Sequence, residues 1–225
     1  MRVSCLIPAH NEAPRIGAVL DAALANPLID EVIVIDDGST DATAHVAARP
    51  GVRLLHMAQN GGKTRALAAG IALSQGRYLL FLDADLVGLT PRDLTRLLLP
   101  VLTGKAATSI SLRRNAPFLW RWIGLDYISG ERVLPRAMIA PHAEALCRLP
   151  RFGVEVYINA LWIAARHPIA VVRWRGVASP TKARKRGLVA GIRADIAMLH
   201  DIARAIGPAA ALRQILSLLR QSRSA

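Results

Sequence analysis

The sequence lacks any uninterrupted apolar run of the roughly 18 residues that a membrane-spanning helix needs. Cysteine is scarce, because Cys5 and Cys147 are the only two, too few for a disulfide framework. The first residues read as a strand and lack the apolar region and cleavage site of a signal peptide. A composition with 52% hydrophobic and 20% charged residues excludes wholesale disorder. We therefore expect a folded, cytoplasmic protein with two reduced thiols.

Acidic residues are few in the last part of the chain. The net charge is +13, yet residues 1–100 carry nine Lys or Arg against ten Asp or Glu. Residues 173–225 carry eleven Lys or Arg against two Asp. Such an asymmetry indicates a polyanion or an anionic membrane surface as a partner of the C-terminal part.

The first half of the chain alternates short apolar runs with amphipathic ones. The apolar runs predict strands at residues 3–7, 31–35, 52–56 and 78–82. The amphipathic runs predict helices at residues 13–24, 42–48, 64–74 and 91–99. Asp41 and Thr90 are expected to be the N-caps of the second and fourth helices. Alternating strands and helices predict an α/β fold with a mostly parallel sheet flanked by helices.

The second half has a less regular pattern. It predicts strands at residues 106–112, 129–134 and 169–174, and helices at residues 141–149 and 154–165. Two amphipathic helices are then expected at residues 188–206 and 209–221, separated by a Gly-Pro pair. We therefore expect one domain over residues 1–187, with halves 1–100 and 101–187, and a helical C-terminal extension over residues 188–225.

Polar clusters follow each of the first four predicted strands, at residues 7–12, 36–41, 60–65 and 83–85. Ligands of an open parallel sheet bind beyond the carboxyl ends of its strands. The most informative cluster is Asp83-Ala84-Asp85, because two carboxylates at the end of a buried strand can hold Mg²⁺ or Mn²⁺. Such a cation keeps several waters and is completed by substrate phosphates. Together the clusters predict a site for a nucleotide with its diphosphate.

The side chains of these clusters suit that ligand. Carboxylates such as Asp37 and Glu12 can accept hydrogen bonds from a base N–H or from ribose hydroxyls. Lys63 stands beside a glycine pair at a helix start and suits an anionic or carbonyl-rich group. A cation at Asp85 would neutralise charge on a departing diphosphate. Neither the P-loop pattern nor the Gly-x-Gly-x-x-Gly fingerprint occurs.

In this order, Ile-Pro-Ala-His-Asn-Glu, Asp-Asp-Gly-Ser-Thr-Asp, Asn-Gly-Gly-Lys and Asp-Ala-Asp resemble a family 2 glycosyltransferase of the GT-A fold. The resemblance is strong over residues 1–95 and looser to residue 187. It implies a nucleotide-diphospho-sugar donor, a divalent metal and an acceptor held by the second half. By position it implies that the base and ribose are held by Pro8, Ala9, Glu12 and Asp37. It also places Lys63 against the nucleotide, Asp83 near the ribose and sugar, and Asp85 on the metal.

The segments Ser129-Gly130-Glu131-Arg132 and Gly153-Val154-Glu155 resemble acceptor-side segments of polyprenyl-phosphate and glycerate-type sugar transferases. If the reaction inverts the anomeric centre, a carboxylate must take the proton of the acceptor hydroxyl. Glu155 is the first candidate for this catalytic base and Glu131 the second. Related enzymes often add a late histidine to the metal, but residues 176–179 contain none. The metal would then depend on Asp85, phosphates and water.

Other interpretations remain open at this point. A nucleotidyltransferase would also use carboxylates and a metal, and a non-catalytic protein could bind sugar nucleotides. A nucleic-acid-binding module is disfavoured, because the positive charge is concentrated in the C-terminal part and no nucleic-acid-binding motif occurs.

The basic residues 182–186 and the two helices after them favour peripheral binding to an anionic membrane, at its cytoplasmic face, with a lipid-linked or small acidic acceptor. For Trp120 and Trp122 the sequence favours ordinary packing over contact with an acceptor or lipid headgroups. The sequence leaves open the sugar, the base, the acceptor, the anomeric outcome and the oligomeric state.

Overall fold

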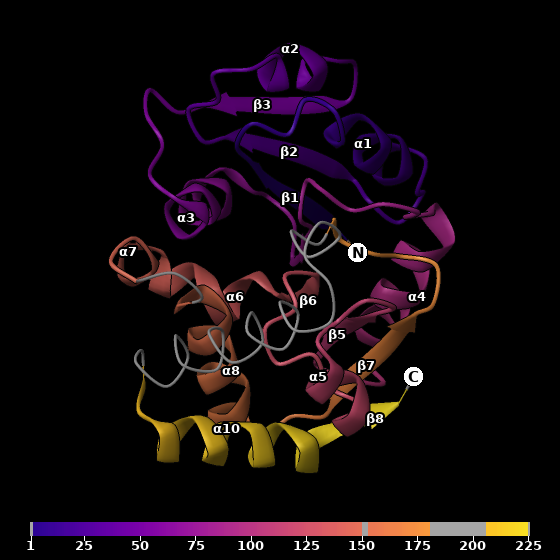
Figure 1. Ribbon diagram of the computed structural model, residues 1–225, viewed down its shortest axis with the longest axis vertical. Helices are drawn as coiled ribbons and strands as arrows, with labels where there is room; N and C mark the ends of the chain where they lie inside the picture. The colour runs from indigo at the N-terminus through magenta and orange to yellow at the C-terminus, as the bar shows by residue number, and fades with distance from the viewer. Residues whose placement is uncertain (1, 150–152, 181–205, 225) are drawn as a thin grey trace.

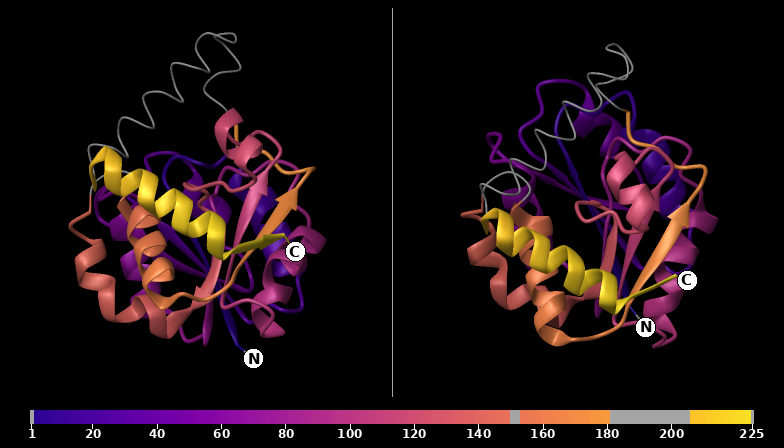
Figure 2. Two further views of the ribbon diagram at one scale, coloured as in Figure 1. Left: turned by 90° about the horizontal axis from the view of Figure 1, so that it is seen from below. Right: turned by 60° about the horizontal axis from the view of Figure 1, so that its bottom comes forward.

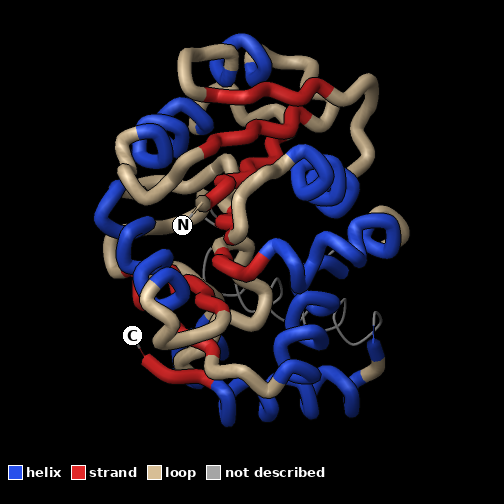
Figure 3. The backbone as a smooth tube through the Cα atoms, turned by 180° about the vertical axis from the view of Figure 1, so that it is seen from behind, coloured by secondary structure: helices blue, strands red, loops and turns tan. Residues whose placement is uncertain are grey.

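The architecture is that of a computed structural model, which describes residues 2–149, 153–180 and 206–224. Its centre is an eight-stranded sheet with the strand order β3-β2-β1-β4-β6-β5-β7-β8, which Figures 1 and 3 show as one continuous layer. The strands are β1 (Val3–Ala9), β2 (Glu31–Asp36), β3 (Val52–His56), β4 (Tyr78–Phe81), β5 (Thr108–Arg113), β6 (Arg132–Pro135), β7 (Ile169–Trp174) and β8 (Ser222–Ser224). Among the strands of the described residues, only β6 runs against the others, because it pairs antiparallel with both β4 and β5. The predicted α/β class with a mostly parallel sheet is confirmed.

Helices cover both faces of the sheet (Figure 1). They are α1 (Ile16–Leu24), α2 (Thr43–Ala47), α3 (Lys63–Leu73), α4 (Pro91–Leu102), α5 (Phe118–Ile123), α6 (Arg136–Ile139), the 3-10 helix η1 (Ala140–His142), α7 (Ala143–Leu146), α8 (Gly153–Ala165) and α10 (Pro208–Gln221). One core lies between the sheet and α1 and α4, and a second lies between the sheet and α3, α8 and α10. None of the helices in the described ranges is both long and apolar enough to cross a membrane.

The two cores explain why the first strands are apolar at nearly every position. Side chains of a strand alternate between the two faces of the sheet. In β1, Cys5 and Ile7 enter the core of α1 and α4, whereas Leu6 enters the core of α3 and α8. Both faces of a parallel sheet are buried, so a continuous apolar run is the expected pattern. Burial also raises the pKa of the Cys5 thiol above its usual value.

Most helices begin within one residue of the prediction, but α1 begins later, and α6, η1 and α7 replace the single helix predicted at residues 141–149. Helix α1 begins at Ile16 rather than at residue 13, because a turn intervenes in which the N–H of Arg15 donates to the carbonyl of Glu12. Helix α2 begins at Thr43, so the N-cap position is that of Ala42 and the prediction for Asp41 is wrong by one residue. The carboxylate of Asp41 instead accepts the Thr43 N–H from outside the helix. The predicted cap at Thr90 is confirmed, with a reciprocal capping box to Asp93.

The end of the described chain belongs to the same sheet and core. Helix α10 packs on α8, and β8 adds to the edge of β7 (Figure 2). The strand β8 was not predicted, because Ser-Arg-Ser has neither apolar character nor alternation. The predicted helix at residues 209–221 is confirmed within one residue. The basic cluster at residues 182–186 and residues 188–205 of the other predicted helix lie outside the described residues.

Candidate functional site

The polar clusters that follow β1, β2 and β4 meet the start of α3 at one edge of the sheet. They line a cavity of about 300 Å³ formed by Pro8, Ala9, His10, Glu12, Asp37, Lys63, Asp83, Ala84 and Asp85. Every residue predicted to bind the donor or the metal is among them. The parallel direction of the strands explains this convergence, because their carboxyl ends open onto the same edge.

A second cavity of about 440 Å³ adjoins the first. It is lined by Gly61, Gly62, Lys63, Thr64, Asp83, Arg113, Ile128, Leu149, Val154 and Glu155. Lys63 and Asp83 line both cavities, so this pair stands between them. Glu155, the first candidate for the catalytic base, lies in the second cavity.

Lys63 holds carboxylates from two distant segments together. Its Nζ lies 2.7 Å from Oδ1 of Asp83 and 3.0 Å from Oε1 of Glu155. Burial by itself would lower the pKa of Lys63, but the two carboxylates outweigh burial and raise it above its usual value. Lys63 is therefore a permanent cation at the junction of the two cavities.

Asp37 organises the loop before α3. Its Oδ1 accepts the N–H of Gly61 at 2.8 Å, and its Oδ2 accepts the N–H of Gly62 at 2.7 Å. The neighbouring Gly38 has a φ of +66°, and a Cβ there would lie 2.6 Å from the backbone nitrogen of Asn60. Only glycine permits this close approach of the two loops. Lys63 is thereby fixed by the segment after β2 as well as by its own helix.

Two side chains after β1 are also engaged within the protein. Both Nε and a terminal nitrogen of Arg15 contact Oε2 of Glu12, at 2.7 Å and 2.6 Å. Nδ1 of His10 lies 2.9 Å from the carbonyl oxygen of Asp37. Glu12 therefore presents to the first cavity a carboxylate that is already partly neutralised.

The two carboxylates of Asp83-Ala84-Asp85 have opposite electrostatic surroundings. Burial would raise the pKa of Asp83, but Lys63 and Arg113 hold it below its usual value. The pKa of Asp85 is raised to about 6, first by burial and then by the negative charges of Asp83 and Glu12. The negative charge of Asp85 is thus not balanced by the surrounding side chains.

A divalent cation would balance the negative charge at Asp85. Oxygen donors of a single carboxylate suit Mg²⁺ or Mn²⁺, which take their remaining ligands from phosphates and water. In the described ranges, no group of three or more His, Cys, Asp or Glu side chains forms a metal site. A cation at Asp85 would accordingly depend on oxygens from a bound ligand.

Arg113 was not selected from the sequence, although it ends β5 and so lies at the edge where ligands bind. Its side chain is 12% exposed, and Nη1 lies 3.4 Å from Oε1 of Glu131 and 3.9 Å from Oδ2 of Asp83. Its Nη2 lies 3.6 Å from Oδ2 of Asp126. The strand-end rule that found Asp83 would have found Arg113 as well. Asp126 gave no such signal, because it follows no predicted strand.

Glu131 is buried near the two cavities but lines neither of them. It directly precedes β6, and because β6 is antiparallel this places it at the same edge as the ends of β4 and β5. It is fully buried, and its Oε2 accepts hydrogen bonds from Ser111 and Ser129 at 2.6 Å and 2.8 Å. Glu131 lines neither of the two cavities formed by the described residues.

Gly130 makes room for the carboxylate of Asp83. A Cβ at position 130 would lie 2.5 Å from Oδ1 and 2.6 Å from Oδ2 of Asp83. Arg132 holds the loop that contains Gly130, because its guanidinium donates to the carbonyls of Ser129 and Tyr127 at 2.6 Å and 2.9 Å. The position of Asp83 is therefore set by a rigid, glycine-dependent contact.

The chain is similar to proteins of a known family. The model of the family described as Glycosyl transferase family 2 matches residues 4–144. Glucosyl-3-phosphoglycerate synthase of Mycolicibacterium paratuberculosis is 37% identical over 111 residues, 45% of this chain and 34% of that relative. Dolichyl-phosphate beta-glucosyltransferase of Drosophila melanogaster is 39% identical over 101 residues, 38% of this chain and 31% of that relative. The chain therefore spans about a third of the curated relatives that it matches.

Several solved structures similar to this chain hold ligands. Among them is the crystal structure of glucosyl-3-phosphoglycerate synthase from Mycobacterium tuberculosis in complex with Mn²⁺, uridine-diphosphate-glucose and phosphoglyceric acid. The TM-score is 0.65 at 26% sequence identity, and the alignment covers 98% of this chain and 79% of the other.

Proposed function

Since the chain belongs to glycosyl transferase family 2, we propose that it transfers glucose from uridine-diphosphate-glucose to an anionic acceptor, with Mg²⁺ or Mn²⁺ as cofactor. The observation that carries this proposal is that all the predicted donor and metal residues line one cavity. The ligands of the similar Mycobacterium tuberculosis structure support the choice of donor and metal. Family membership favours sugar transfer over the nucleotidyl transfer that the sequence left open.

The donor would occupy the first cavity. Pro8 and Ala9 would contact the base, and the carboxylates of Glu12 and Asp37 would accept hydrogen bonds from base or ribose. Asp37 can do so although both of its oxygens already accept a backbone N–H, because each carboxylate oxygen has two acceptor positions. Asp83 would then lie toward the ribose and the sugar.

The metal would be held by Asp85. When bound, such a cation stabilises negative charge on the phosphates of the leaving group. The chain's own contribution is the electrostatic setting. Asp83 is neutralised by Lys63 and Arg113, whereas Asp85 keeps the unbalanced charge that attracts a cation.

The acceptor would occupy the second cavity. Lys63 and Arg113 supply positive charge there, which suits a phosphate or carboxylate group on the acceptor. We assign the base to Glu155, which would take the proton of the acceptor hydroxyl if the transfer inverts the anomeric centre. Glu131 remains the second candidate. Glu155 lines the second cavity, whereas Glu131 lines neither of the two cavities formed by the described residues, and this favours Glu155.

Two acceptor classes have specific support. A small phosphorylated acid is supported by the phosphoglyceric acid of the similar structure. A lipid-linked phosphate is supported by the dolichyl-phosphate relative. In the second case the protein would associate peripherally with an anionic membrane at its cytoplasmic face. Helix α10 supports such an association, because Leu212 and Leu216 are exposed on it.

A calorimetric titration tests the donor assignment. Uridine-diphosphate-glucose should bind in the presence of MnCl₂ and much more weakly with the chelator EDTA, while adenosine diphosphate serves as the unmatched nucleotide. Transfer is then followed with radiolabelled donor and either 3-phosphoglycerate or a polyprenyl phosphate. Absence of donor binding would contradict the proposal. Donor binding without turnover on any acceptor would favour a non-catalytic sugar-nucleotide-binding protein.

A further inference from the structure

Helix α5 exposes two large aromatic side chains beside a cavity lined by arginines. Phe118 is 69% exposed and Trp122 is 76% exposed. They are four residues apart on the helix and so lie on one face of it. The adjacent cavity, of about 200 Å³, is lined by Leu112, Arg113, Arg114, Arg121, Arg173, Trp174 and Arg175. We call this surface, made of Phe118, Trp122, Arg114, Arg121, Arg173 and Arg175, the aromatic–arginine face.

The two aromatic side chains are not explained by the packing of the fold. Trp120, on the opposite side of the same helix, is fully buried and packs on Tyr127 with ring centroids 5.7 Å apart. Trp120, with the partly buried Leu119 and Ile123, therefore anchors α5 on the core without Phe118 or Trp122. The ordinary packing that the sequence favoured is correct for Trp120 and wrong for Trp122.

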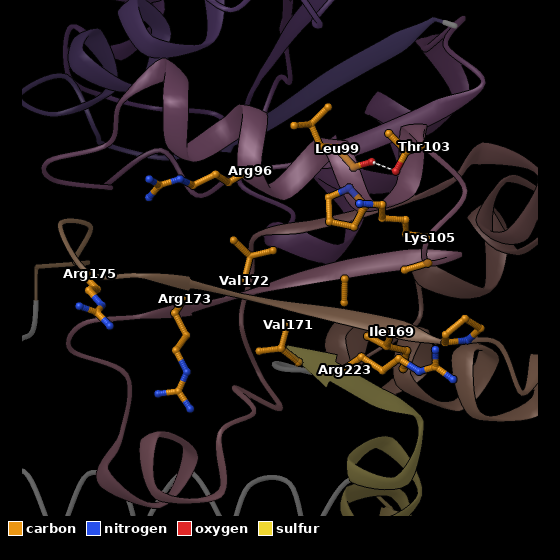
Figure 4. Close-up of a pocket in the computed structure, with 14 residues that line it drawn as sticks. Arg96, Leu99, Thr103, Lys105, Ile169, Val171, Val172, Arg173, Arg175 and Arg223 are labelled. Carbon is orange, nitrogen blue, oxygen red and sulfur yellow. Dashed lines mark hydrogen bonds between the residues drawn. The ribbon is translucent and has the colours of Figure 1, made fainter. Parts of the chain in front are cut away.

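A larger groove continues from the arginine cavity along β7. It has a volume of about 870 Å³ and shares Arg173 and Arg175 with the smaller cavity (Figure 4). Its apolar lining includes Leu99, Val171 and Val172. Further basic residues at its rim are Arg96, Lys105 and Arg223. No acidic side chain of the described residues lines either cavity.

We propose that the aromatic–arginine face docks on an anionic phospholipid bilayer. Aromatic rings beside arginines suit the interface of a bilayer, where the rings enter the headgroup layer and the guanidinium groups bind lipid phosphates. The lack of acidic residues gives the charge complementarity that such a surface requires. The inference deepens the membrane association proposed above, on which it rests, by assigning the contact to α5 and the end of β7.

This orientation also connects the bilayer with the proposed site. Arg113 lines both the arginine cavity and the second cavity, and it lies 3.9 Å from Asp83. A bilayer on the aromatic–arginine face would thus lie next to the cavity assigned to the acceptor. A lipid-linked acceptor could then reach that cavity from the headgroup layer.

Vesicle flotation tests the inference with the full chain. Vesicles of phosphatidylcholine with phosphatidylglycerol are compared with vesicles of phosphatidylcholine alone. The wild type should float only with the anionic vesicles. Arg114→Gln with Arg121→Gln should weaken partitioning by roughly 25-fold, because each basic residue near an anionic surface contributes about fivefold. Phe118→Ser with Trp122→Ser should weaken it by about tenfold or more, through lost apolar burial.

Matched controls distinguish this face from other basic and apolar surfaces of the protein. Arg2→Gln with Arg77→Gln removes the same charge at the amino-terminal edge of β1 and β4, and it should leave flotation unchanged. Leu212→Ser with Leu216→Ser changes the exposed leucines of α10. If only the α10 variant loses flotation, membrane association stands and the aromatic–arginine face is refuted. A wild type that stays in solution with anionic vesicles refutes both.

Two further readouts complete the test. Each variant should keep the wild-type melting temperature and the wild-type calorimetric affinity for uridine-diphosphate-glucose with Mn²⁺. Failure of the wild type to bind this donor would overturn the proposed function without bearing on flotation. Binding of a single-stranded oligonucleotide, lost in the Phe118 and Trp122 variant and unaccompanied by vesicle binding, would assign the face to nucleic acid and overturn the inference.

Discussion

The ammonium of Lys63 lies 2.7 Å from the carboxylate of Asp83 and joins the two cavities of the site. The same ammonium contacts Glu155 at 3.0 Å. Lys63 therefore holds in place both Asp83, which we assign to donor binding, and Glu155, which we assign as the base for the acceptor hydroxyl.

Replacing Lys63 by Met should destabilise the protein, because two carboxylates then lose their shared cation. We expect about 1–3 kcal/mol at pH 7, less than for a fully buried pair because Lys63 is 37% exposed. The lowered pKa of Asp83 contributes stability above the ordinary carboxyl pKa, and this contribution disappears on acidification below it. The difference between variant and wild type should thus shrink in urea titrations at low pH. Lys63→Arg should retain most of the stability, and Lys105→Met should change nothing.

Gly130→Ala should disturb Asp83 without adding or removing any charge. The new Cβ would lie 2.5 Å from Oδ1 of Asp83, so the carboxylate or the loop must shift. A displacement of this kind reduces kcat/KM by about 100-fold when the group positions substrate. Gly17→Ala is the matched control, because its Cβ meets the flexible end of Arg49 at 3.4 Å and Cγ1 of Val46 at an ordinary contact distance of 3.7 Å. Full activity of Gly130→Ala would show that the position of Asp83 is not critical.

Asp85→Ala should abolish transfer and leave the fold intact. If Asp85 holds the metal, the variant loses several kcal/mol of stabilisation of the negative charge on the leaving diphosphate. This loss corresponds to at least about 10³-fold in turnover. Turnover is measured with radiolabelled donor, and folding by circular dichroism. Undiminished turnover would contradict the role of Asp85.

Asp85→Asn should stabilise the metal-free protein at pH 7. The pKa of Asp85 is raised to about 6, so the folded state binds a proton more tightly than the unfolded chain. Its contribution to stability is therefore lost as the pH rises from about 4 to about 6. The gain at pH 7 should be about 1–2 kcal/mol, because the side chain is partly exposed and solvent screens its charge. Thermal melts from pH 4 to 7 in EDTA should show the difference growing with pH, and MnCl₂ should stabilise only the wild type.

Glu155→Gln should slow turnover by about 10²–10⁴-fold and change donor affinity much less, as expected for a general base. Equal losses in turnover and affinity would indicate a structural role through Lys63. Glu131→Gln provides the comparison. Because Glu131 is fully buried and bonded to Ser111 and Ser129, its variant should lose stability before it loses specific activity.

The sequence predicted which residues converge on the first cavity, because the evidence there is local. Strands β1 and β4 are apolar and short, and Asp83 and Asp85 directly follow one of them. Their meeting at one edge follows from the parallel direction of the strands alone. The contact of Asp37 with the N–H groups of Gly61 and Gly62 could not be predicted, because it depends on how closely two loops approach.

The second half was less predictable because β6 reverses direction. The residues that follow a parallel strand lie at the edge of the sheet that holds the site, whereas for β6 the residue before the strand, Glu131, lies at that edge. The triple pairing of Arg113 joins residues from three segments, and no spacing in the sequence indicates it. The predicted base candidates Glu155 and Glu131 are both buried, but of the two only Glu155 lines the second cavity, which the packed structure alone reveals.

The addition of β8 to the edge of β7 affects how membrane attachment can be studied. A protein shortened before residue 206 would expose the hydrogen-bonding edge of β7 and the side of α8 that Ala211 and Leu218 cover. Bare edges of this kind recruit strands from other molecules and lead to aggregation. Membrane attachment and catalysis should therefore be separated by side-chain replacements on α5 and α10, because truncation would cause aggregation.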